Sequence, residues 1–218
     1  MVGRSLAKGL FALSLVLTLL LPDVPVRGQE AGYRPGLLYR EDWRESPAET
    51  PVSQAHVQHP ELILNLHGPG RDSLKKSHHD EPVDDPYYVW SGLCTGTWGL
   101  SLRYPHGLLD LSGYGKIRLR SRQSGLRVLH LMLELGDGRW VVSREGVPAS
   151  GDWVVTEFPV PELHWYHIDL QSLLEGAPVP DPDLSRIRSV GCTDLMRGGG
   201  SAASSRLDWI EIYAFSGL

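Results

Sequence analysis

The sequence predicts an all-β domain, an antiparallel sandwich or barrel, and three observations support this. Short runs of alternating apolar and polar residues recur along the chain, at 38–43, 62–68, 98–104, 115–122, 127–135, 152–158, 187–195 and 207–215. Turn-forming residues such as QSG, GDG and ASGD bound these runs. No long run has helical spacing, and several short strands at close spacing are typical of sandwiches and barrels.

The first 28 residues have the pattern of a secretory signal peptide. Arg4 and Lys8 precede an apolar run that ends near Leu21, and this run is shorter than the ~20 residues of a membrane-spanning helix. Small residues at Val26 and Gly28 predict cleavage after Gly28. We therefore expect a secreted or periplasmic protein with no transmembrane segment after cleavage. An uncleaved N-terminal anchor is the alternative.

The rest of the chain predicts one domain. Residues 29–37 are expected to form a flexible lead and residues 38–218 a single β-domain, with an irregular arm at 45–86. Within this arm we expect one helical turn near 53–57, a strand at 62–68 and a polar loop at 69–88. The net charge is −5 and there is no basic stripe, which argues against a nucleic-acid partner.

Two strands can be interpreted residue by residue. In KIRLRSR, Ile117 and Leu119 share one face, and the opposite face carries Lys116, Arg118, Arg120 and Arg122. In LHLMLEL the leucines share one face, and the other carries His130, Met132 and Glu134. If QSGLR closes a hairpin between these strands, the arginines lie beside His130 and Glu134. That face is then either a solvated, charge-paired surface or the floor of a ligand groove.

The glycine-rich stretch DLMRGGGSAASS, residues 194–205, raises the question of a phosphate loop. Such a loop opens a helix and uses helical N–H groups to bind the anion. Here an alternating, isoleucine-rich run follows and no lysine succeeds the glycines. We interpret the stretch as a connection between two strands. Shortening Gly198–Gly200 is expected to affect stability or loop mobility more than any activity.

Cys94 and Cys192 are the two cysteines of the chain and form a candidate disulfide in an oxidising compartment. Two buried free thiols are the alternative. SHHDEPVDDPYY gathers His78, His79 and several carboxylates, but neighbouring residues of an extended chain face opposite sides. Calcium could use Asp84 and Asp85, yet the spacing of a calcium loop is absent, so no metal or other cofactor is predicted.

The sequence contains no GxSxG elbow, HExxH helix or cysteine–histidine signature. The carboxylates that could form a glycosidase pair are Glu134, Asp152, Glu157, Asp169, Asp208 and Glu211, and spacing selects no two of them. Tryptophan (7) is commoner than phenylalanine (3), and its broad ring suits sugar stacking as well as core packing.

Several motifs resemble the galactose-binding-like β-sandwiches. They are LDLSGYGKIRLRSRQSG at 109–125, DWVVTEFPVPEL at 152–163, DLSRIRSVGCTDL at 183–195 and SSRLDWIEIYAF at 204–215. The resemblance covers residues 88–215 and is to the jelly rolls of carbohydrate-binding modules and of the complex I intermediate-associated protein family. The chain is also similar to exported bacterial proteins that share WSGLC, DLMRGGGS and RLDWIEIY, a likeness that implies no chemistry.

The resemblance implies a jelly-roll sandwich that binds a carbohydrate on a sheet face or at end loops, without catalysis. The residues implied for that site are Arg118, Arg120, His130 and Glu134, with Trp140 or Trp153 as the stacking ring. Two alternatives remain open because fold does not imply function. One is a hydrolase or lyase acting on polysaccharide, and the other is a structural or assembly protein that binds another protein.

Overall fold

The described residues form two antiparallel β-sheets, here called sheet A and sheet B, that enclose a common core. The computed structural model describes residues 33–92, 94–197 and 202–216. The expected signal peptide, its cleavage after Gly28 and the glycines Gly198–Gly200 lie outside them. The predicted antiparallel β-sandwich is confirmed.

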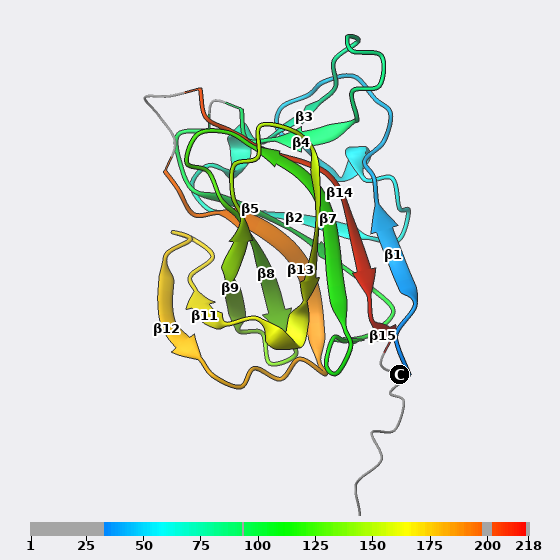
Figure 1. Cartoon of the computed structure of the whole chain (residues 1–218), viewed down its shortest axis with the longest axis vertical. Helices are drawn as coiled ribbons and strands as arrows, with labels where there is room; N and C mark the ends of the chain where they lie inside the picture. The colour runs from blue at the N-terminus through cyan, green and yellow to red at the C-terminus, as the bar shows by residue number, and fades with distance from the viewer. Residues whose placement is uncertain (1–32, 93, 198–201, 217–218) are drawn as a thin grey trace, which may run out of the picture. The chain divides into compact units, whose positions relative to one another are not determined.

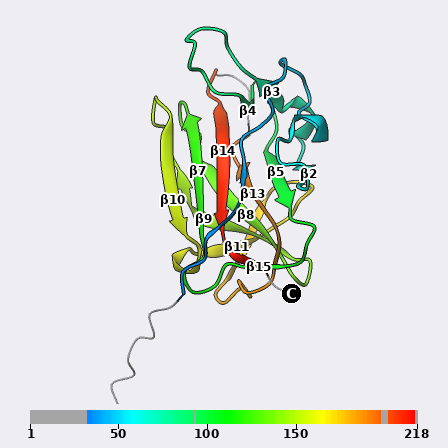
Figure 2. The same ribbon diagram turned by 90° about the vertical axis from the view of Figure 1, so that its right-hand side faces the viewer.

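Sheet A has six strands within the described residues, in the order β10-β7-β14-β4-β3, with β1 also paired to β14. Their bounds are β1 (Leu37–Glu41), β3 (Lys75–Ser77), β4 (Tyr88–Trp90), β7 (Lys116–Gln123), β10 (Val154–Pro159) and β14 (Ser205–Tyr213). β1 and β4 share one edge of β14, β1 pairing at 210–213 and β4 at 206–207. Figure 2 shows β10, β7 and β14 side by side.

Sheet B has nine strands within the same described ranges, in the order β12-β11-β9-β8-β13-β5-β2, with β6 paired to the start of β13 and β15 paired to β6. Their bounds are β2 (Ile63–His67), β5 (Trp98–Arg103), β6 (Leu109–Asp110), β8 (Leu129–Leu135), β9 (Trp140–Val147), β11 (Trp165–Ile168), β12 (Glu175–Val179), β13 (Ile187–Asp194) and β15 (Phe215–Ser216). In Figure 1 β12, β11, β9, β8 and β13 follow one another across this sheet.

Period-two alternation places one side of each central strand in the core. Ile117 and Leu119 of β7 are buried, as are Leu129, Leu131, Leu133 and Leu135 of β8, and all belong to one apolar cluster. The predicted core faces of both strands are therefore confirmed.

The predicted hairpin between β7 and β8 is wrong. β7 pairs with β10 and β14 of sheet A, whereas β8 pairs with β9 and β13 of sheet B. The segment between them, residues 124–128, is an arch that crosses from one sheet to the other. Hydrogen bonds between Ser124 and Ser204 and the buried Arg127–Asp194 ion pair hold this arch.

The arm at 45–86 is more ordered than the sequence suggested. The expected helical turn is a 3-10 turn at Gln54–His56, and the expected strand at 62–68 is β2. The stretch 69–88, interpreted as a loop, contains a second 3-10 turn (Arg71–Ser73) and the short strand β3. β3 was not predicted because its sequence, KKS, lacks the apolar alternation of a strand. It lies at the edge of sheet A, where lysines are common.

Cys94 and Cys192 do not form the candidate disulfide; both are buried free thiols, which was the alternative expectation. Cys192 lies in β13, and burial raises the pKa of its thiol. The Cys94 thiol donates to the Gly70 carbonyl at 3.0 Å. Among the described residues there is no helix with the length and apolarity to cross a membrane.

Candidate functional site

The outer face of sheet A carries charged and aromatic side chains in register. Cross-strand pairs place Arg120 opposite Trp209, Arg118 opposite Glu211 and Lys116 opposite Tyr213. Arg40 of β1 stands on the other side of Glu211, and Glu157 of β10 stands beside Arg118. We call this surface the arginine face, and its members are Arg40, Lys116, Arg118, Arg120, Glu157, Trp209, Glu211 and Tyr213.

Glu211 is the centre of the arginine face. Its carboxylate accepts from Arg40 at 3.0 Å, from Arg118 at 3.2 Å and from the Tyr213 hydroxyl at 3.1 Å. The Glu211 side chain is only 9% exposed, whereas those of Arg40 and Arg118 are 37% and 34% exposed. A buried carboxylate thus fixes two guanidinium groups that remain open to solvent.

The ring of Trp209 lies beneath the same two guanidinium groups. The guanidinium carbon of Arg40 is 4.5 Å from the ring centroid, and that of Arg118 is 5.8 Å from it. Cation–π contacts of this kind contribute about 0.5–1 kcal/mol each at partly exposed sites. They hold the two guanidinium groups close to the ring of Trp209.

Asp208 departs from the alternation because a β-bulge interrupts β14 between Leu207 and Trp209. Bulges redirect a side chain and are over-represented beside functional sites. Asp208 is almost fully buried and pairs with Arg120 at 2.5 Å. Burial raises the pKa of Asp208 to about 6 and outweighs the lowering effects of the hydrogen bond and charge of Arg120, while the charge of Asp42 adds a smaller rise.

A pocket of about 690 Å³ opens at the Asp208 end of the arginine face. Asp42, Trp43 and Asp208 line it, with Tyr87 from the chain just before β4. A carboxyl group with a raised pKa in a pocket is a frequent sign of a functional site.

Trp43 is held in this pocket wall by an anchored segment. Its φ is +47°, a conformation that a non-glycine residue rarely adopts. The fully buried Glu41 carboxylate accepts from the backbone N–H groups of Trp43, Gln58 and His59 at 2.7–3.0 Å. Burial raises the pKa of Glu41, while these three hydrogen bonds lower it. The arm is thereby fastened to the end of β1.

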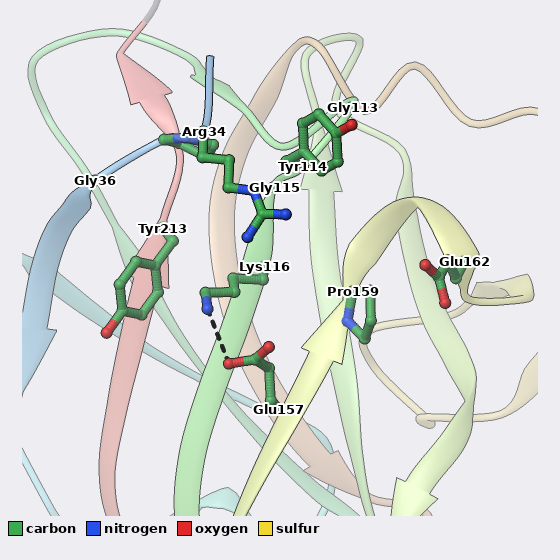
Figure 3. Close-up of a pocket in the computed structure, with 11 residues that line it drawn as sticks. Arg34, Gly36, Gly113, Tyr114, Gly115, Lys116, Glu157, Pro159, Glu162 and Tyr213 are labelled. Atoms are coloured by element: carbon green, nitrogen blue, oxygen red, sulfur yellow. Dashed lines mark hydrogen bonds and ion pairs between the residues drawn. The ribbon is translucent and has the colours of Figure 1, made fainter. Parts of the chain in front are cut away.

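A second pocket, of about 350 Å³, lies at the opposite end of the arginine face. Figure 3 shows the Arg34 guanidinium between the rings of Tyr114 and Tyr213, with Lys116 below it. Lys116 donates to Glu157 at 2.9 Å and its ammonium lies 4.8 Å from the Tyr213 ring centroid. The arginine face therefore runs between two hollows.

The six side chains predicted to form one binding site are divided between the two outer faces of the sandwich. Arg118 and Arg120 belong to sheet A, and Trp153 lies just before β10 of that sheet, with its ring centroid 5.3 Å from the guanidinium carbon of Arg120. The other three, His130, Glu134 and Trp140, belong to sheet B. The structure therefore does not bring these six side chains together in one place, and a glycan-binding role for any of them stays a prediction.

The sheet B residues are engaged in structural contacts. The His130 ring bonds to the Ser143 carbonyl at 3.0 Å, and Glu134 accepts from Ser189 at 2.6 Å. The Trp140 ring centroid is 5.0 Å from that of His67. Part of this outer face is covered by an apolar cluster of Val142, Ile168, Leu173 and their neighbours.

From the sequence, Asp208 and Glu211 were two of six candidate carboxylates, and Trp209, Arg40 and Asp42 were not singled out as site residues. The pair Asp208–Trp209 between Leu207 and Ile210 was the available signal, because two successive residues that interrupt the alternation of a strand indicate a bulge. No group of three or more potential metal ligands occurs in residues 33–92, 94–197 and 202–216.

Among solved structures, the chain is similar to carbohydrate-binding modules. A family 11 module of a cellulosomal cellulase of Clostridium thermocellum has 14% identity and a TM-score of 0.45, covering 83% of this chain and 95% of that one. A family 30 module has 14% identity and a TM-score of 0.45, covering 83% and 91%. A family 61 module in complex with β-1,4-galactotriose has 11% identity and a TM-score of 0.37, covering 72% and 88%.

No protein-family model matches the sequence, and no curated protein matches it. The chemistry of the arginine face is consequently the basis for a functional assignment.

Proposed function

We propose that this protein binds a glycan chain across the arginine face of sheet A. The observation that carries the proposal is the alternation of half-exposed guanidinium groups with buried carboxylates over the ring of Trp209. A sugar hydroxyl both donates and accepts hydrogen bonds, and arginine supplies donors only while carboxylates supply acceptors only. Adjacent Arg40, Arg118 and Glu211 therefore complement vicinal hydroxyl groups.

The dimensions of the arginine face suit an oligosaccharide better than a single sugar. Asp208 lines one pocket and Tyr213 lines the other, five residues further along β14. At about 3.4 Å per residue this interval is about 17 Å. A glycan chain lying along β14 would place its ends in the two pockets.

Arg118→Ala is expected to weaken binding to a retained oligosaccharide roughly tenfold, equivalent to about 1.4 kcal/mol. The matched control is Arg188→Ala on sheet B, since Arg188 is 35% exposed and is ion-paired with Glu134 at 3.4 Å. Binding would be screened on a panel of soluble and insoluble polysaccharides and measured by calorimetry on the best ligand. Loss of binding in Arg188→Ala but not in Arg118→Ala would move the site to sheet B and reject the proposal.

The pocket at Asp208 favours a second candidate, hydrolysis of the bound glycan. Asp208 would donate a proton to the oxygen of the leaving sugar as the glycosidic C–O bond breaks. Asp42 would accept a proton from the water that adds to the other sugar. The observation in favour is the nearly buried Asp208 carboxyl, whose pKa is raised to about 6, in the same pocket as Asp42.

If Asp208 is the acid, its protonated form is the active one, so the rate of sugar release should fall as the pH rises through about 6. Asp208→Asn should abolish release, because an amide cannot donate the proton. Reducing ends would be assayed in the incubations used for binding. Binding without product at any pH between about 4 and 8 would leave the non-catalytic function standing and remove this candidate.

A further inference from the structure

Sheet A carries a second row of outward side chains beside the arginine face. Lys75 of β3 pairs with Trp90 of β4, Trp90 pairs with Arg206 of β14, and Arg206 pairs with Arg122 of β7. The adjoining Val89–Leu207 pair belongs to the core, so these four side chains point to the outer face. We call Lys75, Arg122 and Arg206 the cation row.

The cation row has no counter-charges within the described residues. Arg40, Lys116, Arg118 and Arg120 of the arginine face are each ion-paired with a carboxylate. By contrast, no ion pair involves a member of the cation row. Arg122 and Arg206 stand directly opposite each other, a like-charge pair that destabilises a sheet. A chain with a net charge of −5 thus has three cations, on β3, β14 and β7, that form no ion pair within the described residues.

Aromatic rings lie beside these cations. The Lys75 ammonium and the Arg206 guanidinium carbon are each 5.6 Å from the Trp90 ring centroid. Continuing the β7–β10 register by one residue places Trp153 opposite Arg122. Because Trp153 also contacts Arg120, the cation row is continuous with the arginine face.

We infer that the cation row binds acidic groups of the glycan that lies on the arginine face, so the ligand class is an acidic polysaccharide. This inference rests on the proposed function and specifies its ligand. Arg122 and Arg206 stand on adjacent strands about 4.8 Å apart, and Lys75 stands two strands, or about 9.6 Å, beyond Arg206. A polymer with one carboxylate or sulfate on each sugar would present its charges in a series along the same line. Trp90 and Trp153 would contact the apolar faces of the sugar rings.

The neighbouring charges favour a glycan over a nucleic acid. A phosphate backbone that followed sheet A would leave the cation row and meet Glu157, Glu211, Asp208 and Asp42, all on or beside the arginine face. Because these carboxylates neutralise the cations of the arginine face, a phosphate backbone would gain no net attraction there. An acidic polysaccharide carries hydroxyl groups as well as anions, so the same carboxylates would accept hydrogen bonds from it.

The test compares polymers that differ only in charge. Affinity would be measured for polygalacturonate against its methyl ester, and for dextran sulfate against dextran, which separates carboxylate from sulfate recognition. We expect at least one acidic polymer to bind roughly tenfold more tightly than its neutral partner, and this preference should shrink as salt screens the charges. In Arg122→Gln/Arg206→Gln the preference should fall to within about twofold.

The matched control is Arg144→Gln/Arg186→Gln, which removes the same charge from two exposed arginines outside sheet A. It should retain the full preference. Equal binding of acidic and neutral polymers, abolished by Arg118→Ala, would overturn the inference while leaving glycan binding in place. An equally tight complex with a single-stranded oligonucleotide would also overturn it. Failure to bind any polymer would reject both the inference and the proposed function.

Discussion

Glu41→Ala is expected to destabilise the protein by about 3–5 kcal/mol, because three backbone N–H groups lose their acceptor at once. These N–H groups belong to Trp43, Gln58 and His59, and the Glu41 side chain that accepts from them is fully buried. Each buried donor left unpaired costs about 1–3 kcal/mol, and partial entry of water reduces the sum. The melting temperature should fall by about 10 °C.

The same substitution should damage the pocket at Asp208. Glu41 holds Trp43 at its positive φ and fastens residues 58–59 of the arm beside it, and both Trp43 and Gln58 line that pocket. Glycan binding should therefore weaken even at temperatures where the variant is folded. Asp72→Ala is the control, since Asp72 is an exposed carboxylate of the same arm and lines neither pocket. A melting temperature within about 2 °C of the wild-type value in Glu41→Ala would show that water replaces the carboxylate.

The behaviour of β7 and β8 shows how far alternation can predict this fold. Both strands have the buried and outward faces that their sequences indicated. The prediction that they pair with each other was wrong, because two strands joined by a hairpin and two strands joined by an arch between sheets show the same alternation. Contacts that distinguish the two, Ser124 with Ser204 and Arg127 with Asp194, join residues 80 and 67 positions apart. A pattern within one strand cannot predict contacts between residues so far apart in the sequence.

The candidate site was limited by the same long-range pairing. Arg118 and Arg120 were selected correctly as outward residues of one strand, but their partners come from β10 and β14. Glu211 becomes central only because β14 lies between β1 and β7. The cation row escaped notice for a related reason, since Lys75 lies in a three-residue strand within a stretch that was interpreted as a loop.

The arch between β7 and β8 depends on a buried ion pair, whose loss should be the other large effect. Arg127 and Asp194 are 5% and 1% exposed and lie 3.1 Å apart. Asp194 also accepts from the Ser205 hydroxyl and from the Met196 N–H. Asp194→Ala is expected to cost about 3–5 kcal/mol, because the Arg127 guanidinium remains buried without a counter-charge.

Arg127→Met should lower the free energy of unfolding by a comparable amount, because the Asp194 carboxylate would stay buried without a counter-charge. The double variant should be more stable than Asp194→Ala alone, since neither charge is then left uncompensated, and the coupling free energy should be at least about 2 kcal/mol. Urea unfolding of all four proteins measures this cycle. Strictly additive losses would mean that the two side chains act separately and that the backbone of the arch, held through Ser124 and Ser204, joins the sheets without them.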